Sequence, residues 1–125
     1  MAQHNELGKK GEEKAIAFLT SIGHVLLATN YRAGRDEVDV ITRQNNTIIF
    51  TEVKTRSTDY YGHPEEFVDK KKRKAMKKVA EAFLLENNLN IDIRFDIVSI
   101  TNTQGELKVY HIPDAFFNEE NDNYK

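Results

Sequence analysis

The chain has 125 residues, which suits one domain of ordinary size, and its hydrophobic fraction of 39% is sufficient for a compact core. It contains no cysteine and no apolar run near the roughly 20 residues of a membrane span, so disulfide scaffolds, cysteine-ligated zinc and membrane-spanning helices are excluded. The formal net charge of −2 does not by itself indicate a nucleic-acid partner, so the distribution of charge matters more than its sum.

Residues 6–22 have the periodicity of an amphipathic helix, and Gly23 follows where helices commonly end. Glu12 falls inside the apolar arc, where an acidic side chain is costly unless it is paired or coordinated. Gly8 and Gly11 share that face and would let another backbone or a ligand approach closely. The alternative is that Glu12 lies barely buried in the first turns and only complements the helix dipole.

A strand is predicted for residues 24–31, followed by a turn or loop over residues 30–35. Residues 37–41 and 48–54 then predict a hairpin around the pair Asn45-Asn46. Its β-branched and aromatic residues favour strands, and adjacent Asn residues tolerate the positive φ angles of a two-residue turn.

The register of this hairpin predicts a polar site. It places Asp39 directly opposite Glu52, with Cβ atoms roughly 4.5–5.5 Å apart, and Glu37 opposite Lys54. Two opposed carboxylates repel each other unless a cation lies between them, and Mg²⁺ binds in this way while keeping several waters. Lys54 points to the same face, where it could hold an attacking water or a phosphate oxygen. The alternative is a chance pair of solvated carboxylates with Lys54 as a local salt bridge.

Residues 55–66 lack periodicity and predict a loop, in which Arg56, His63 and the aromatic residues could contact a polynucleotide. Residues 68–89 predict a second helix with one broad apolar face. Its outer surface is basic near the start and carries Lys70, Lys71, Arg73, Lys74, Lys77 and Lys78. Lys72 is the exception, because it lies in the middle of the apolar face and must either reach solvent or meet an anion.

Strands are predicted for residues 91–100 and 106–112, and residues 118–125 are expected to form a disordered tail. The resulting order is α-β-β-β-α-β-β. We therefore expect an α/β fold with a small mixed sheet flanked by helices, in a single domain spanning residues 1–117. Residues 1–5 show no signal-peptide core, which predicts a cytoplasmic protein with no membrane partner.

Several segments in this order resemble a known family. They are Gly8-x-x-Gly11-Glu12-x-x-Ala15, Asn30-Tyr31-Arg32, Glu37-Val38-Asp39-Val40-Ile41, Phe50-Thr51-Glu52-Val53-Lys54-Thr55-Arg56, Gly62-x-Pro64 and Arg94-Phe95-Asp96. The ordered set is similar to the YraN-like family of bacterial proteins, which look like archaeal Holliday-junction resolvases within the PD-(D/E)XK nuclease superfamily. The sequence departs from these patterns at Val38, where the superfamily has Pro, and at Asp36, where many relatives have Gly.

The resemblance implies a restriction-endonuclease-like core and a site that binds a divalent cation. By match, Glu12, Asp39 and Glu52 would bind Mg²⁺ or Mn²⁺, and Lys54 would assist the attacking water. The expected partner is DNA, and a homodimer is a further expectation. The residues expected to contact DNA are Lys70, Lys72, Arg73, Lys74, Lys77 and Arg56.

Three functions remain open at this point. The first is a metal-dependent endonuclease acting on DNA, including branched or recombination intermediates. The second is a nucleic-acid-binding module that keeps the nuclease-like fold without cleavage. The third is an interaction protein whose basic helix is only a solvated surface. The convergence of Glu12, Asp39, Glu52 and Lys54 from separate segments favours the first.

Overall fold

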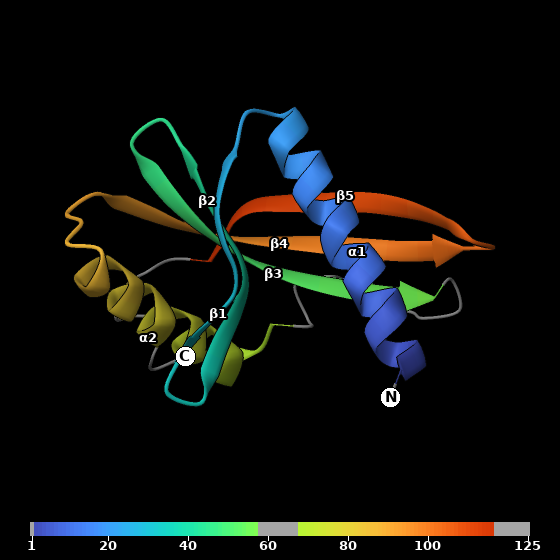
Figure 1. The fold of residues 1–125 in the computed structure, drawn as a ribbon, viewed down its shortest axis with the longest axis horizontal. Helices are drawn as coiled ribbons and strands as arrows, with labels where there is room; N and C mark the ends of the chain where they lie inside the picture. Colours follow the sequence, from blue (N-terminus) through green and yellow to red (C-terminus); the bar gives the residue numbers. More distant parts are fainter. Residues whose placement is uncertain (1, 58–67, 117–125) are drawn as a thin grey trace.

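The structure is a computed structural model that describes residues 2–57 and 68–116. Its elements follow the predicted order α-β-β-β-α-β-β (Figure 1). They are α1 (Ala2–Ser21), β1 (Val25–Ala33), β2 (Asp36–Gln44), β3 (Thr47–Ser57), α2 (Lys70–Glu86), β4 (Asp92–Thr103) and β5 (Glu106–Phe116).

The strands form one mixed sheet in the order β1-β2-β3-β4-β5. Only β3 and β4 are parallel, and α2 lies between them in the chain, as a crossover between parallel strands requires. One helix covers each face of the sheet, so successive residues of a central strand enter opposite cores. On β4, Ile97 packs in the core under α2 and Val98 in the core under α1. The predicted fold class is confirmed.

The two cores differ in size and composition. The core under α2 is the larger and is rich in aromatic residues, with Phe50 beside Phe83 and Phe95 stacked on Phe116 at a centroid distance of 4.9 Å. The core under α1 is small and aliphatic, and is built around Ala15 and Leu19. Because it buries fewer large side chains, α1 depends more on polar contacts for its position on the sheet.

The predicted end of the first strand at residue 31 is wrong, and so is the length of the loop that follows it. Residues 30–35 do not form a loop, because β1 continues to Ala33 and only Gly34, with φ of 65°, and Arg35 make the turn. Tyr31 pairs with Val38 and packs edge-on against Phe83, and this burial favours the strand over a loop. The extension matters for the site because Asn30 now lies inside a strand.

The other boundaries shift by a few residues. Helix α2 begins at Lys70 rather than at residue 68, because the Asp69 side chain caps it by accepting a 2.9 Å bond from the Lys72 N–H. Residues 55–57 belong to β3, and the last two strands extend beyond residues 100 and 112. The remainder of the predicted loop, including residues 60–64, and the predicted tail at 118–125 lie outside the described residues.

Candidate active site

The predicted hairpin register is confirmed from the turn to the middle of the strands. Asn45 adopts φ of 55°, and the pairing runs from Gln44↔Thr47 to Val40↔Thr51. Beyond that pair β2 and β3 separate, so the predicted pairing of Asp39 with Glu52 and of Glu37 with Lys54 is wrong. The Val53 N–H donates a 2.8 Å bond to Asp39 Oδ2, so a side chain replaces the backbone acceptor of a continued antiparallel pair. The site forms where the two strands diverge, and we call this point the fork.

Asp39 and Glu52 occupy the fork together, and their side chains are hydrogen-bonded to each other. Glu52 is only 4% exposed. Burial, and then the charge of Asp39, raises the pKa of Glu52 to about 7. Burial also raises the pKa of Asp39, against the opposing effects of the Val53 N–H and Lys72. Two carboxylates in contact, one buried and one partly buried, cannot both ionise easily without a cation.

Two lysines flank Glu52 from different elements. Lys54 Nζ lies 3.8 Å from Glu52 Oε2, which confirms that Lys54 shares its face of β3. Lys72 Nζ reaches over from α2 to 3.6 Å from Glu52 Oε1 and donates a 3.2 Å bond to the Glu37 carbonyl. Both N···O distances to Glu52 exceed those of charge-assisted hydrogen bonds, which are about 2.7–2.9 Å. The lysines therefore offset the negative charge without saturating the carboxylate.

Helix α1 brings Glu12 to the same region from the opposite face of the sheet. Asn30 holds φ of 49° within β1 and donates a 3.0 Å bond to Glu12 Oε1. Burial raises the pKa of Glu12, the Asn30 bond opposes that shift, and the nearby charge of Asp39 adds to it. Asn30 is a site residue whose role the sequence reading missed. The feature of the sequence that could have indicated this role is the residue type, because Asn tolerates left-handed backbone better than most residues.

One glycine sets how closely α1 lies on the sheet. A Cβ atom at Gly11 would overlap Thr55 Oγ1 on β3, so Gly11 does permit a close approach, made by a side chain rather than by the predicted backbone or ligand. At Gly8 nothing in the described chain lies within 4 Å of an added Cβ, so no backbone approaches there, and Gly8 lines the groove described below, where a ligand could still approach. Contact at Gly11 places the adjacent Glu12 beside the fork.

A groove of about 770 Å³ opens onto the fork between α1 and the strands. Glu12, Asp39, Lys54 and Arg56 all line it. Glu52 is buried and is not part of the groove wall. A substrate in the groove would therefore meet Asp39, Lys54 and Glu12 directly.

The acidic pair fits part of a divalent-cation site. Glu52 Oε1 is buried and accepts no hydrogen bond from the described residues, which is the state of an oxygen awaiting a ligand. Mg²⁺ needs only one or two carboxylates and keeps several waters. No group of three or more His, Cys, Asp or Glu side chains converges on one point in residues 2–57 and 68–116. The fit is therefore to Asp39 and Glu52, with Glu12 nearby and bonded to Asn30.

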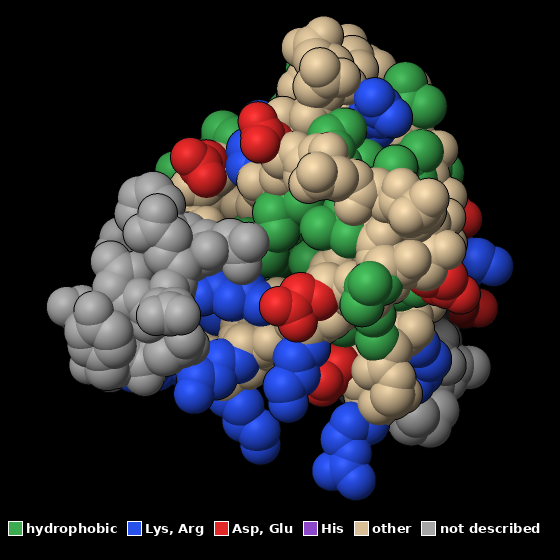
Figure 2. All heavy atoms as spheres, turned by 90° about the vertical axis from the view of Figure 1, so that its left-hand side faces the viewer, with side chains coloured by type: hydrophobic (Ala, Val, Ile, Leu, Met, Phe, Trp, Pro, Cys, Tyr) green, Lys and Arg blue, Asp and Glu red, His purple; other side chains and the backbone are tan. Residues whose placement is uncertain are grey.

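Helix α2 carries a basic surface, which we define as Lys70, Lys71, Lys74, Lys77 and Lys78. Lys71, Lys74 and Lys78 are exposed, and Lys70 and Lys77 are partly buried. Lys and Arg side chains gather on the lower part of the face that is seen in Figure 2. A cluster of this kind is the electrostatic footprint expected for a phosphate-bearing partner.

The other predicted DNA-contacting residues have additional roles. Lys72 points to the fork, as described above. Arg73 donates a 3.2 Å bond to the Val68 carbonyl and lies 5.4 Å above the Phe116 ring, so it holds the start of α2 against the core. Arg56 lies on the groove, close to the opening of the fork.

A second buried acid lies on β4, under the C-terminal part of α1. Arg94 donates two bonds to Asp96, of 2.9 and 2.8 Å, and the Asp114 N–H donates a third of 2.9 Å. His111 Nε2 lies 2.8 Å from the same carboxylate. We call Asp96, Arg94, His111 and Asp114 the β4 network. The sequence showed only that Arg94 and Asp96 interrupt an apolar strand.

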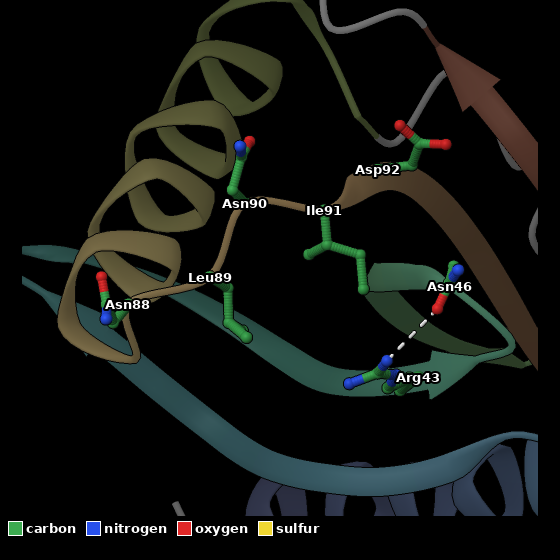
Figure 3. Close-up of a pocket in the computed structure, with 7 residues that line it drawn as sticks. All are labelled: Arg43, Asn46, Asn88, Leu89, Asn90, Ile91 and Asp92. Carbon is green, nitrogen blue, oxygen red and sulfur yellow. Dashed lines mark hydrogen bonds between the residues drawn. The ribbon is translucent and has the colours of Figure 1, made fainter.

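A further cavity of about 460 Å³ lies at the turn end of the hairpin, away from the fork. Figure 3 shows its lining. Arg43 is held by the turn, with Nε donating a 3.0 Å bond to the Asn45 carbonyl, and Asp92 points away from Arg43. Among the described residues, Asp92 is the one carboxylate in its lining, and the Arg43 side chain is already bonded to the turn. This cavity therefore offers no reactive group comparable to the fork.

The fold and the fork define a mixed α/β protein with a carboxylate pair, of which Glu52 is buried, between two diverging strands. The chain belongs to the uncharacterised protein family UPF0102, whose model matches residues 11–100. A UPF0102 protein of Christiangramia forsetii is 44% identical over 117 residues, covering 94% of this chain and 98% of the relative. UPF0102 proteins of Flavobacterium psychrophilum and Bacteroides thetaiotaomicron are each 38% identical over 117 residues, covering 94% of this chain and 98% and 97% of theirs. The YraN-like resemblance is thereby confirmed.

In the part of the chain that the structure describes, neither α1 nor α2 is long and apolar enough to cross a bilayer.

Proposed function

We propose that this protein is a metal-dependent endonuclease that hydrolyses phosphodiester bonds in DNA. The observation that carries the proposal is the fork itself, where the buried Glu52 meets the partly buried Asp39 and Glu52 Oε1 has no hydrogen bond from the described residues. A structural acid would be expected to have its acceptors satisfied. An acid with one unpartnered oxygen, next to a second acid that lines a groove, is typical of a cation site with a catalytic purpose.

The residues of the site would have different roles in this reaction. A bound Mg²⁺ or Mn²⁺ would polarise the phosphodiester and lower the pKa of a coordinated water. Asp39 and Glu52 would hold that cation, with Glu12 at the edge of the groove binding one of its waters. Lys54 Nζ, 3.8 Å from Glu52, would orient the attacking water and stabilise negative charge that develops on the phosphate.

The basic surface of α2 supports a polynucleotide as the substrate. Contacts between lysines and phosphates release counterions, so binding of this kind weakens steeply as salt rises. Replacing Lys70, Lys74 and Lys77 by Glu should weaken DNA binding and flatten its salt dependence without unfolding the protein. A wild-type protein with no salt-dependent binding to DNA would remove this support.

Cleavage of a panel of linear, flapped and four-way DNA substrates with Mg²⁺ or Mn²⁺ tests the proposal. Asp39→Asn and Lys54→Ala should each lower the rate at least about a hundredfold while DNA binding stays near that of wild type. Lys108→Ala, an exposed lysine on β5, serves as the control for loss of one charge. Equal cleavage by wild type, Asp39→Asn and Lys54→Ala would show that the activity does not come from the fork.

The second candidate is a nucleic-acid-binding module without catalysis. It is favoured by the two lysines near Glu52 and by the absence, among the described residues, of three converging acids. Under this alternative the protein binds DNA through α2, and neither its melting temperature nor its affinity for DNA responds to Mg²⁺ or Mn²⁺.

A further inference from the structure

Lys72 lies where a helix normally carries an apolar residue. Met76, one turn further along α2, is fully buried, and Val79 follows it on the same face. The Lys72 side chain is 32% exposed, whereas Lys71 and Lys74 are exposed beside it. A lysine on this face gives up hydration of its ammonium group, so a specific anion is needed to offset that cost.

That anion is part of the fork. Lys72 Nζ lies 3.6 Å from Glu52 Oε1, the buried oxygen without a hydrogen bond, and donates a 3.2 Å bond to the Glu37 carbonyl on β2. One ammonium group therefore connects β2 and β3 on the α2 side of the fork. On the strands themselves, Asp39 connects them by accepting the Val53 N–H.

Lys54 cannot replace Lys72 in this role. It approaches the other oxygen, Glu52 Oε2, at 3.8 Å and lies on the groove where the substrate would bind. Lys72 comes from the opposite side and does not line the groove. Lys72 approaches Glu52 Oε1, the oxygen without a hydrogen bond, and this is the atom that a bound cation would use as a ligand.

We propose that Lys72 is the resident counter-ion of the Asp39–Glu52 pair and holds the place that a divalent cation takes. The part of this inference that concerns cation binding rests on the proposed function. It separates Lys72 from the basic surface of α2, whose lysines would contact DNA. In the metal-free protein Lys72 stabilises the fork, and on cation binding it must move away from Glu52 because like charges repel.

The first test measures the metal-free protein by a double-mutant cycle on melting temperature. Lys72→Met should lower the melting temperature by at least about 5 °C, because it leaves a buried carboxylate without its counter-ion. In the Glu52→Gln background the same change should cost less than about 2 °C, since the charge is gone. Lys71→Met, on the same turn with an exposed side chain, is the matched control and should have little effect in either background. An equal cost of Lys72→Met in both backgrounds would overturn the counter-ion role.

The second test measures binding of Mn²⁺ alone, without DNA, by calorimetry or electron paramagnetic resonance. Lys72→Met should bind Mn²⁺ roughly three- to tenfold more tightly than wild type, because the competing ammonium group is removed. Lys72→Arg keeps the charge and should retain an affinity near that of wild type. If Lys72→Met fails to fold, Lys72→Arg still tests whether a cation at this position sets the affinity for Mn²⁺. Affinity unchanged in Lys72→Met, or changed equally in Lys71→Met, would overturn the competition.

The two tests separate this inference from the proposed function. If wild type binds no Mn²⁺, the proposed function and the competition fail together, while the cycle still decides whether Lys72 neutralises Glu52. If Mn²⁺ binds and DNA is cleaved but the cycle shows no coupling, the function stands and the role of Lys72 is wrong. Loss of DNA affinity in Lys72→Met, with melting temperature and Mn²⁺ affinity matching Lys71→Met, would make Lys72 an ordinary DNA contact.

Discussion

The fork and the β4 network both bury acids in the same sheet, and they treat them in opposite ways. Burial alone would raise the pKa of Asp96, but bonds from His111, Arg94 and the Asp114 N–H hold it below its usual value. At the fork, burial dominates and raises the pKa values of Asp39 and Glu52. A buried acid with a structural role therefore has its hydrogen-bond donors within the chain, whereas the fork keeps acceptor capacity for a group that is not part of the chain.

Removing the acid of the β4 network should have the largest effect on stability. Asp96 is fully buried, and Asp96→Asn leaves the Arg94 guanidinium without its carboxylate. We expect a loss of roughly 3–5 kcal/mol in the free energy of unfolding, measured by urea denaturation. Glu106→Gln, an exposed acid at the start of β5, is a control that should change stability little. A small loss of stability for Asp96→Asn would remove the contrast between the β4 network and the fork.

The two sites should also respond to pH with opposite signs. The folded-state pKa of Glu52, about 7, exceeds its ordinary value of 4.5, so the folded protein binds more protons between these values. Its contribution to stability therefore falls as pH rises from 4.5 to 7, by roughly 3 kcal/mol in the metal-free protein. Melting curves of wild type and Glu52→Gln across this window measure the slope, which should be lost in the variant. A slope that persists in Glu52→Gln would assign it to another group.

Asp96 completes the pH comparison. Its folded-state pKa lies below 3.8, so its stabilisation is fully present above that value and is lost as pH falls through the folded-state pKa. The acid limb of the melting profile should therefore flatten in Asp96→Asn while the slope between 4.5 and 7 from Glu52 remains. Loss of both slopes in Asp96→Asn would show that the two sites are coupled.

Helix α1 offers a smaller test of how the fork is assembled. Gly11→Ala forces a methyl group against Thr55 and should cost roughly 1–3 kcal/mol. Gly8→Ala meets nothing and should stabilise the helix by roughly 0.5–1 kcal/mol. Because Gly11→Ala also shifts Glu12 away from Asp39, we expect weaker Mn²⁺ binding in that variant only. Equal effects of the two variants would show that close contact at Gly11 does not position Glu12.

The smallest expected effect on stability is that of Asp39→Asn without metal. Asn keeps an acceptor for the Val53 N–H and removes repulsion with Glu52, so stability should be unchanged or slightly raised. Asp39→Ala lacks the acceptor and should lose roughly 1–3 kcal/mol. Thermal melting with and without Mn²⁺ measures both, and Asp39→Asn should lose any stabilisation by the metal. A sharp loss for Asp39→Asn would make Asp39 mainly a structural acceptor, as Asp96 is.

Local pattern was sufficient for the element order and for the hairpin register. Side chains alternate along a strand, so the Asn45-Asn46 turn fixed the pairing as far as Val40 and Thr51 and brought Asp39 and Glu52 to the next positions. It did not predict that the strands separate there. The same pattern marked Lys72 as an anomaly on an apolar face, because helical spacing is equally regular. It did not identify the anion that Lys72 meets.

The partners that complete the two acid sites come from elements that are distant in the chain and meet only through packing. Asn30 bonds Glu12 across 18 residues of chain, Lys72 reaches Glu52 from another element, and Asp96 gathers His111 and Asp114 from β5. Such contacts depend on how far each strand extends and how closely each helix approaches, which packing against distant residues determines. Local propensity does not contain that information, and for this reason the sequence could place the acids but not predict which one would be left short of partners.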